Sequence, residues 1–182
     1  LLVSRRTAAG IEDPGYPDVR NMVSLATSNI VCLNLDRQGV IPDADFARSN
    51  VAFLTVSHQC PTTSVMPLER RKMLLQAARV DDVLIVEDDY EADLSIESDG
   101  DIPSLKSLDS DGRVIYVGSF SKVLAPGLRV GYIVAPRPVI DELRVLRRLM
   151  LRHPPTNNQR ALANFIALGH YRDLFDATST LA

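Results

Sequence analysis

The chain has 182 residues, of which 46% are hydrophobic and 24% are charged, and its formal net charge at pH 7 is −3. This composition is that of a globular domain with one sizeable core, and the negative charge argues against direct contact of this segment with nucleic acid. The two cysteines are too few for a disulfide framework or a metal cluster, and no apolar run or signal peptide points to a membrane, so we expect a cytoplasmic protein.

The first third of the chain alternates short apolar runs with helical patterns. Strands are predicted over residues 8–12, 30–35 and 51–56, and helices over 18–28 and 42–47, with a turn over 34–39. Strands that alternate with helices favour a parallel sheet with right-handed crossovers. Tyr16 follows the turn at 13–15, at the ligand edge of such a sheet, where its ring could stack on a flat ligand or simply pack over the turn.

A third helix pattern covers residues 67–80, and an apolar run at 83–87 then ends in Glu87-Asp88-Asp89-Tyr90. Adjacent carboxylates at the end of a buried strand are costly unless they meet cations or water. Ligands of open α/β sheets bind at the carboxyl ends of strands, and pyridoxal phosphate needs a carboxylate against its ring nitrogen. Asp88 is the candidate for that contact, with the Tyr90 hydroxyl near the phenolic oxygen of the ring; a solvated acidic turn is the alternative.

Residues 91–110 are polar and predict a loop, after which the apolar run 114–117 predicts a strand. The strand leads into Ser119-Phe120-Ser121-Lys122, and Arg129 follows a Pro-Gly break. The Lys122 amine can form a Schiff base with a phosphorylated aldehyde, while Ser119, Ser121 and Arg129 hold its phosphate. On the Ser-x-Ser-Lys pattern alone, a surface lysine in a loop is an equally good interpretation.

The last third predicts a strand over residues 131–135 and helices over 139–151 and 156–168. The arginines of the first of these helices have the spacing of an exposed helical face, which fits better than a nucleic-acid patch. Thr156 is the expected N-cap of the second helix. Residues 176–182 have the pattern of a ragged end.

Taken together, six motifs resemble the large domain of fold-type I pyridoxal-phosphate enzymes, the class I/II aminotransferases. More narrowly, they resemble the aminotransferase-like domain of MocR-type transcription regulators of the GntR family. They cover residues 9–172 in the order of the family: Glu12-Asp-Pro-Gly-Tyr-Pro17, Ser57-His-Gln-Cys-Pro-Thr62, Ile85-Val-Glu-Asp-Asp-Tyr90, Val114-Ile-Tyr-Val-Gly-Ser-Phe-Ser-Lys122, Pro126-Gly-Leu-Arg-Val-Gly-Tyr132 and Arg152-His-Pro-Pro-Thr156.

The resemblance implies a three-layer α/β/α fold with a mostly parallel sheet, as in aspartate aminotransferase, apparently truncated at both ends. Residues 1–172 would form a partial cofactor-binding domain and 173–182 a divergent end, and the strand at 131–135 would be antiparallel. It assigns the ring-stacking aromatic to Tyr16. It also leaves His58 or Gln59 of the Ser-His-Gln pattern as a polar contact to the cofactor, while Thr63 stands where glycine is usual, which puts the local turn in doubt.

The resemblance also implies a glycine-rich phosphate-binding turn before Tyr16, a small C-terminal domain and, in the regulators, an N-terminal winged helix that contacts DNA. None of these lies in this sequence. Three hypotheses follow: an aminotransferase domain acting on amino acids or related amines, an effector-sensing domain of a MocR-type regulator, and an inactive remnant. The family further implies a homodimer.

Overall fold

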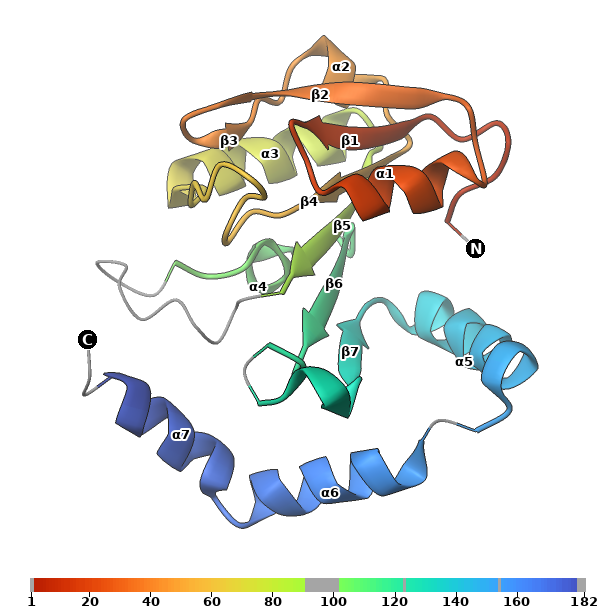
Figure 1. Ribbon diagram of the computed structural model, residues 1–182. Helices are drawn as coiled ribbons and strands as arrows, with labels where there is room; N and C mark the ends of the chain where they lie inside the picture. Colours follow the sequence, from red (N-terminus) through yellow and green to blue (C-terminus); the bar gives the residue numbers. More distant parts are fainter. Residues whose placement is uncertain (1, 91–101, 123, 154, 180–182) are drawn as a thin grey trace.

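The computed structural model describes residues 2–90, 102–122, 124–153 and 155–179. Within these residues the fold is built on a seven-stranded sheet with the order β3-β2-β1-β4-β5-β6-β7 (Figure 1). The strands are β1 (Ala9–Asp13), β2 (Ile30–Asp36), β3 (Gly39–Val40), β4 (Val51–Leu54), β5 (Leu84–Asp89), β6 (Val114–Ser119) and β7 (Gly131–Val134).

Strands β2, β1, β4, β5 and β6 are parallel, and β3 and β7 pair antiparallel at the two ends of the sheet. The predicted mostly parallel sheet is therefore confirmed, and so is the antiparallel strand that the family topology implied for residues 131–135. Strand β3 was not predicted, because the turn expected over 34–39 continues into a two-residue pairing of Gly39 and Val40 with β2.

Helices cover both faces of the sheet, which gives the three layers that were expected (Figure 1). On one face, side chains of α2, α3 and α4 pack on the sheet around Phe46, Leu74 and Leu105. On the other face, α1 and the start of α5 contribute Val23 and Val139. The helices are α1 (Pro17–Ser24), α2 (Ala44–Ala47), α3 (Leu68–Val80), α4 (Leu105–Leu108), α5 (Arg137–Leu151), α6 (Thr156–Ala167) and α7 (His170–Ser179), with a 3-10 turn η2 (Pro126–Leu128).

Three local predictions were wrong. The loop predicted over 91–110 contains α4, which begins because the Ser104 hydroxyl accepts the backbone N–H of Ser107; residues 91–101 lie outside the described residues. Thr156 is the first residue of α6, and Pro155 takes the N-cap position instead. The end expected to be ragged from residue 176 is helical to Ser179, and the last three residues lie outside the described ranges.

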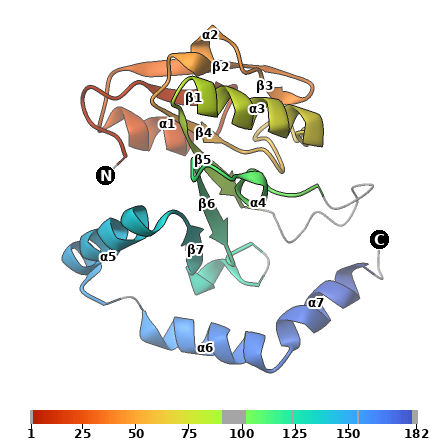
Figure 2. The same cartoon turned by 180° about the vertical axis from the view of Figure 1, so that it is seen from behind.

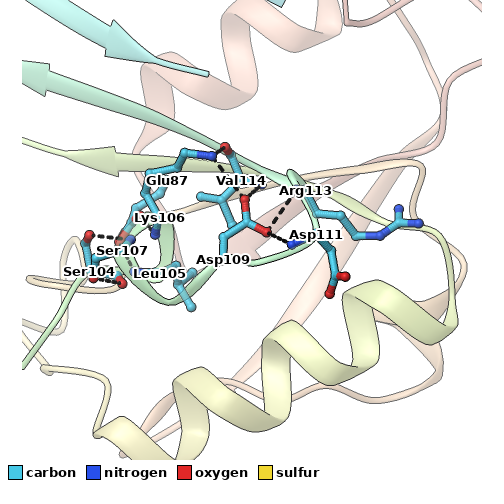
Figure 3. A network of polar contacts seen from close by, with 9 residues as sticks. All are labelled: Glu87, Ser104, Leu105, Lys106, Ser107, Asp109, Asp111, Arg113 and Val114. Atoms are coloured by element: carbon cyan, nitrogen blue, oxygen red, sulfur yellow. Dashed lines mark hydrogen bonds and ion pairs between the residues drawn. The ribbon is translucent and has the colours of Figure 1, made fainter. Parts of the chain in front are cut away.

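The start of β6 is fixed by a polar network around α4 (Figure 3). The Glu87 carboxylate accepts the backbone N–H groups of Leu105 (2.8 Å) and Lys106 (2.9 Å), which satisfies donors at the N-terminus of α4. The Asp109 carboxylate accepts those of Arg113 (3.1 Å) and Val114 (2.9 Å). The network therefore ties β5, α4 and the first residue of β6 into one unit.

Helices α5, α6 and α7 extend from the β7 end of the sheet (Figures 1 and 2). The contacts that hold them to the β6–β7 region include a hydrogen bond from the Asn158 side chain to the Leu128 carbonyl (3.0 Å) and an edge-on contact between Phe120 and Tyr171. Among the described residues, none of the helices is both long and apolar enough to cross a membrane.

Candidate functional site

The carboxyl ends of β4, β5 and β6 lie side by side, because these strands are neighbours in the parallel part of the sheet. Three of the predicted groups of site residues follow these ends: His58 and Gln59 after β4, Asp88 to Tyr90 at the end of β5, and Ser119 to Lys122 after β6. Tyr16 follows β1, the next strand in the sheet. The topology therefore gathers residues that are far apart in sequence at one edge, as expected for a ligand site of an open α/β sheet.

The three carboxylates of β5 are divided between the two faces of the sheet, because successive side chains of a strand point to opposite sides. Glu87 is fully buried and binds the N-terminus of α4. Asp89 is 6% exposed and accepts hydrogen bonds from Ser57 and Tyr116. Asp88, between them, lines a cavity on the opposite face. The alternation therefore places one acidic side chain of the triplet in that cavity.

The cavity has a volume of about 350 Å³ and lies between the sheet and α1. Most of its lining is apolar, with Ile11, Phe53 and Val117 from three strands. Tyr16 and Asp88, two of the residues predicted from the sequence, both line it. An apolar pocket of this size with few polar groups is typical of sites for small molecules.

Burial sets the electrostatics of Asp88. It raises the pKa of the Asp88 carboxyl above its usual value, and the neighbouring Asp89 carboxylate raises it further. A carboxylate whose charge is poorly solvated gains most from a cationic or proton-donating partner. Asp88 is therefore suited to hold a protonated ring nitrogen.

A second buried carboxylate, Glu12, lines the same cavity and was not among the predicted site residues, although it opens the first motif. It is 3% exposed, and its oxygens accept the Thr55 hydroxyl at 2.6 Å and the Thr55 backbone N–H at 3.2 Å. The pKa of Glu12 is raised, chiefly by burial. The only sequence signal for Glu12 was its position near the end of a predicted strand, just before a turn.

Gln59 is held by the protein itself. Its amide nitrogen donates to the carbonyls of Pro14 (2.9 Å) and Cys60 (2.7 Å), and its amide oxygen accepts the Thr62 hydroxyl (2.6 Å). These bonds give Gln59 a role in joining the loop before Tyr16 to the loop after β4. A contact of Gln59 with a cofactor remains a prediction.

Thr63 occupies the position where glycine is usual, and its backbone adopts φ of 60°, in the left-handed region. The turn is closed by hydrogen bonds from the Thr63 N–H to the Gln59 carbonyl (2.7 Å) and from the Gln59 N–H to the Ser64 carbonyl (3.0 Å). The glycine-like conformation is therefore kept with a β-branched residue, for which it is unfavourable.

Lys122, Tyr90 and His58 lie together. The Lys122 amine is 4.6 Å from the centroid of the Tyr90 ring, and the Tyr90 hydroxyl donates to the His58 carbonyl at 3.1 Å. The His58 ring meets the Tyr90 ring edge-on, with 6.2 Å between centroids. The pKa of Tyr90 is raised by burial and, in second place, by Cys60. The ends of β4, β5 and β6 thus each contribute one member of this cluster.

Ser119 is the last residue of β6, and Ser121 and Arg129 lie in the connection between β6 and β7. The Ser119 hydroxyl accepts the Ser121 N–H at 3.1 Å, and the Phe120 N–H donates to the Val130 carbonyl at 3.1 Å. Arg129 ends the 3-10 turn with φ of 49° and remains exposed. The backbone therefore brings the two serines and the arginine to one turn, where a phosphate could meet hydroxyl and guanidinium donors.

These residues fit pyridoxal phosphate by the chemistry of the groups present. The apolar cavity with Tyr16 suits a flat ring, Asp88 suits a protonated ring nitrogen, and Lys122 beside Tyr90 supplies a primary amine. These groups follow neighbouring strands, from Tyr16 after β1 to Lys122 after β6.

Comparisons with known proteins show the family to which the chain belongs. The family model of aminotransferase class I and II matches residues 2–169. The HTH-type transcriptional regulator TauR of Rhodobacter capsulatus is 48% identical over 171 residues, which is 94% of this chain and 35% of TauR. The probable rhizopine catabolism regulatory protein MocR of Rhizobium meliloti is 34% identical over 172 residues, with the same two coverages. The chain thus spans 35% of the length of these relatives.

Solved structures support the fold. LysN, an α-aminoadipate aminotransferase of Thermus thermophilus complexed with N-(5'-phosphopyridoxyl)-L-leucine, is similar with a TM-score of 0.88 and 28% identity, over 98% of this chain and 48% of LysN. The predicted resemblance to aminotransferases and to the aminotransferase-like domain of MocR-type regulators is confirmed by these relatives. The chain therefore belongs to the aminotransferase class I and II family.

Proposed function

We propose that the chain is an aminotransferase-type domain that binds pyridoxal phosphate through Lys122 and reacts with amino acids or related amines. The observation that carries this proposal is the position of Asp88, the residue of an acidic triplet that faces an apolar cavity, at the end of the strand beside the one that leads to Lys122. The phosphopyridoxyl amino acid held by LysN supports it. The proposal takes residues 1–172 as the cofactor-binding part and 173–182 as a divergent end.

The protein side chains have separate roles in this proposal. Asp88 keeps a proton at the ring nitrogen, and the Tyr16 ring covers the cofactor within the cavity. The Tyr90 hydroxyl, which donates to the His58 carbonyl in this structure, turns to the phenolic oxygen. When bound, pyridoxal phosphate supplies an aldehyde that condenses with primary amines and a ring that accepts electrons.

The remaining residues bind the phosphate and move protons. Ser119, Ser121 and Arg129 donate charge-assisted hydrogen bonds to the phosphate. His58 and Gln59 are proposed as further polar contacts to the cofactor. His58 lies in the loop after β4, and its carbonyl accepts the Tyr90 hydroxyl. The Lys122 amine, once released by an incoming amine, accepts and returns a proton as a general base.

A second candidate function is effector sensing in a transcription regulator, and the names of the relatives favour it, since both TauR and MocR are described as regulators. In that case exchange of the Lys122 amine for an amino compound would change DNA binding by a winged helix elsewhere in the full protein. A homodimer and a cytoplasmic setting belong to the same proposal. An inactive remnant is the third reading.

The test is the absorbance spectrum of the purified chain with pyridoxal phosphate, compared with Lys122→Ala and with Lys72→Ala as the matched control. Lys72 is an exposed lysine paired with Glu69 at 2.8 Å, remote from the cavity residues. We expect a visible band in the parent and in the control, fixed by borohydride on the peptide that contains Lys122, and no band in Lys122→Ala. A folded parent without the band would contradict the proposal.

Titration with amino acids then separates the two functions. Turnover releases a keto acid and leaves the cofactor in its amine form, whereas sensing shifts the spectrum reversibly without product. Asp88→Asn is expected to retain the cofactor on Lys122 but to shift the pH dependence of the band, because it no longer stabilises a ring-nitrogen proton. An unchanged pH dependence would remove Asp88 from its assigned role.

A further inference from the structure

Asp89 is a buried carboxylate that the proposed chemistry does not use. It is 6% exposed and lies on the face of β5 opposite to the cavity. Its Oδ2 atom accepts a hydrogen bond from the Ser57 hydroxyl at 3.2 Å and another from the Tyr116 hydroxyl at 3.1 Å. Ser57 follows β4 and Tyr116 lies within β6, so one carboxylate oxygen connects the end of β5 to the residues after β4 and to the neighbouring strand β6.

Each of these partners leads directly to candidate cofactor residues. Ser57 precedes His58, whose carbonyl accepts the Tyr90 hydroxyl. On the other side, the Tyr116 ring packs against Tyr132 with 5.9 Å between centroids. Tyr132 in turn packs against Phe120 at 5.2 Å, the residue between the two serines proposed for the phosphate. Asp89 therefore lies at the junction of both groups.

The electrostatics keep this junction in its hydrogen-bonding form. The pKa of Tyr116 is raised by burial and then by the Asp89 carboxylate, so the Tyr116 hydroxyl keeps its proton and donates. Arg71, a buried guanidinium on α3, has a favourable charge interaction with Asp89. A buried carboxylate with charged and hydroxyl partners is rigidly held, as is needed to fix other groups.

We propose that Asp89 is a positioning residue that holds the ends of β4, β5 and β6 in the arrangement required by the cofactor site on the opposite face. It touches none of the reacting atoms and acts through Ser57 and Tyr116. The role of Asp89 in positioning the cofactor site rests on the proposed function. The junction itself can be tested without cofactor.

The first experiment measures amide hydrogen exchange by mass spectrometry on the cofactor-free chain, for the parent, Asp89→Asn, Ser57→Ala and Tyr116→Phe. Asp89→Asn is expected to raise exchange both in residues 57–60 and in residues 118–122, while each donor variant affects mainly its own segment. Asp109→Asn is the matched control, since Asp109 is also a buried carboxylate and binds the start of β6. It is expected to raise exchange near residues 109–115 and to leave both strand ends unchanged.

The second experiment measures the affinity for pyridoxal phosphate and the pH dependence of its absorbance band. Asp89→Asn is expected to weaken binding about tenfold, the lower end of the effect seen for residues that orient metal-binding side chains. It is also expected to shift the pH midpoint of the band, because the Asp89 charge acts on Asp88. Asp109→Asn is expected to leave both quantities within about twofold of the parent, since it lies outside the site.

The outcomes separate the two proposals. A parent that binds no pyridoxal phosphate contradicts the proposed function, while the exchange data still decide whether Asp89 joins the strand ends. A parent that binds, with Asp89→Asn unchanged in affinity and in the pH midpoint, overturns the positioning role. If Asp89→Asn does not fold, Ser57→Ala and Tyr116→Phe decide the question, because normal exchange and affinity in both would overturn it.

Discussion

Arg71 offers the sharpest test of the energetics behind the site. Its side chain is 1% exposed, and its guanidinium donates to three backbone carbonyls, those of Met66 (2.9 Å), Pro103 (3.0 Å) and Val56 (3.2 Å). Met66 lies just before α3, Pro103 lies just before α4, and Val56 follows β4. Arg71→Met keeps an unbranched apolar side chain but removes the guanidinium, and it leaves all three acceptors without this donor.

The magnitude follows from the number of acceptors and from the charges left behind. Each buried polar group that is left without any partner costs about 1–3 kcal/mol. The Val56 carbonyl keeps one partner, the Met66 N–H at 2.9 Å. The loss also removes a cation that favours the charged forms of Glu87 and Asp89. Since such costs are not additive, we expect Arg71→Met to lower the free energy of unfolding by about 3–5 kcal/mol. For a chain of this size, the melting temperature would fall by roughly 6–20 °C.

Urea and thermal unfolding followed by circular dichroism measure this loss, with Arg79→Met as the matched control. Arg79 lies on the same helix and is exposed, so its replacement should change the free energy of unfolding by less than about 0.5 kcal/mol. Arg71→Lys is expected to recover part of the loss, because an ammonium group cannot reach three separate carbonyls in the same geometry. A loss below about 1 kcal/mol in Arg71→Met would refute the reasoning, since one net hydrogen bond already contributes that much.

Two further predictions concern the loops around the cavity. The pKa of Glu12 is raised above 4.5 in the folded chain. The contribution of Glu12 to the free energy of unfolding therefore falls as the pH rises from 4.5 through the folded pKa. Glu12→Gln has no carboxyl group to ionise, so its free energy of unfolding lacks this fall. Urea titrations should therefore show Glu12→Gln gaining on the parent between pH 4.5 and neutral pH, and a pH-independent difference would contradict the assignment. Thr63→Gly should raise the free energy of unfolding by about 0.5–1 kcal/mol, because it relieves the left-handed conformation. Thr62→Gly, which removes the hydroxyl bonded to Gln59, should lower it in the same assay, and equal effects of the two variants would refute the strain argument.

The mostly parallel sheet and most elements could be predicted from the sequence because the apolar runs and turns are clear. Strand β5 was predicted over 83–87 and extends to Asp89, because the acidic residues find partners that an apolar pattern does not show. Helix α4 was missed for the same reason: its four residues are too few for a periodic pattern, and the Glu87 carboxylate stabilises its start. Both errors come from tertiary contacts that override local propensity.

The motifs located the site residues but could not show which of them share a cavity. Tyr16 and Asp88 come together because β1 and β5 both flank β4. Glu12 was missed, since a single glutamate before a turn has the pattern of a solvated residue until its bonds with Thr55 are seen. The motif residue Gln59 has its amide bound within the protein, a detail that depends on side-chain geometry alone.

The alternation of Glu87, Asp88 and Asp89 across β5 makes the spacing of this strand intolerant of length changes. Deleting or inserting one residue before Glu87 would reverse the direction of all three side chains. Two carboxylates would then enter the apolar cavity, and α4 and Tyr116 would each lose an acceptor. Exchanging aspartate for glutamate would not restore the original side-chain directions. The strand therefore tolerates substitutions better than insertions or deletions.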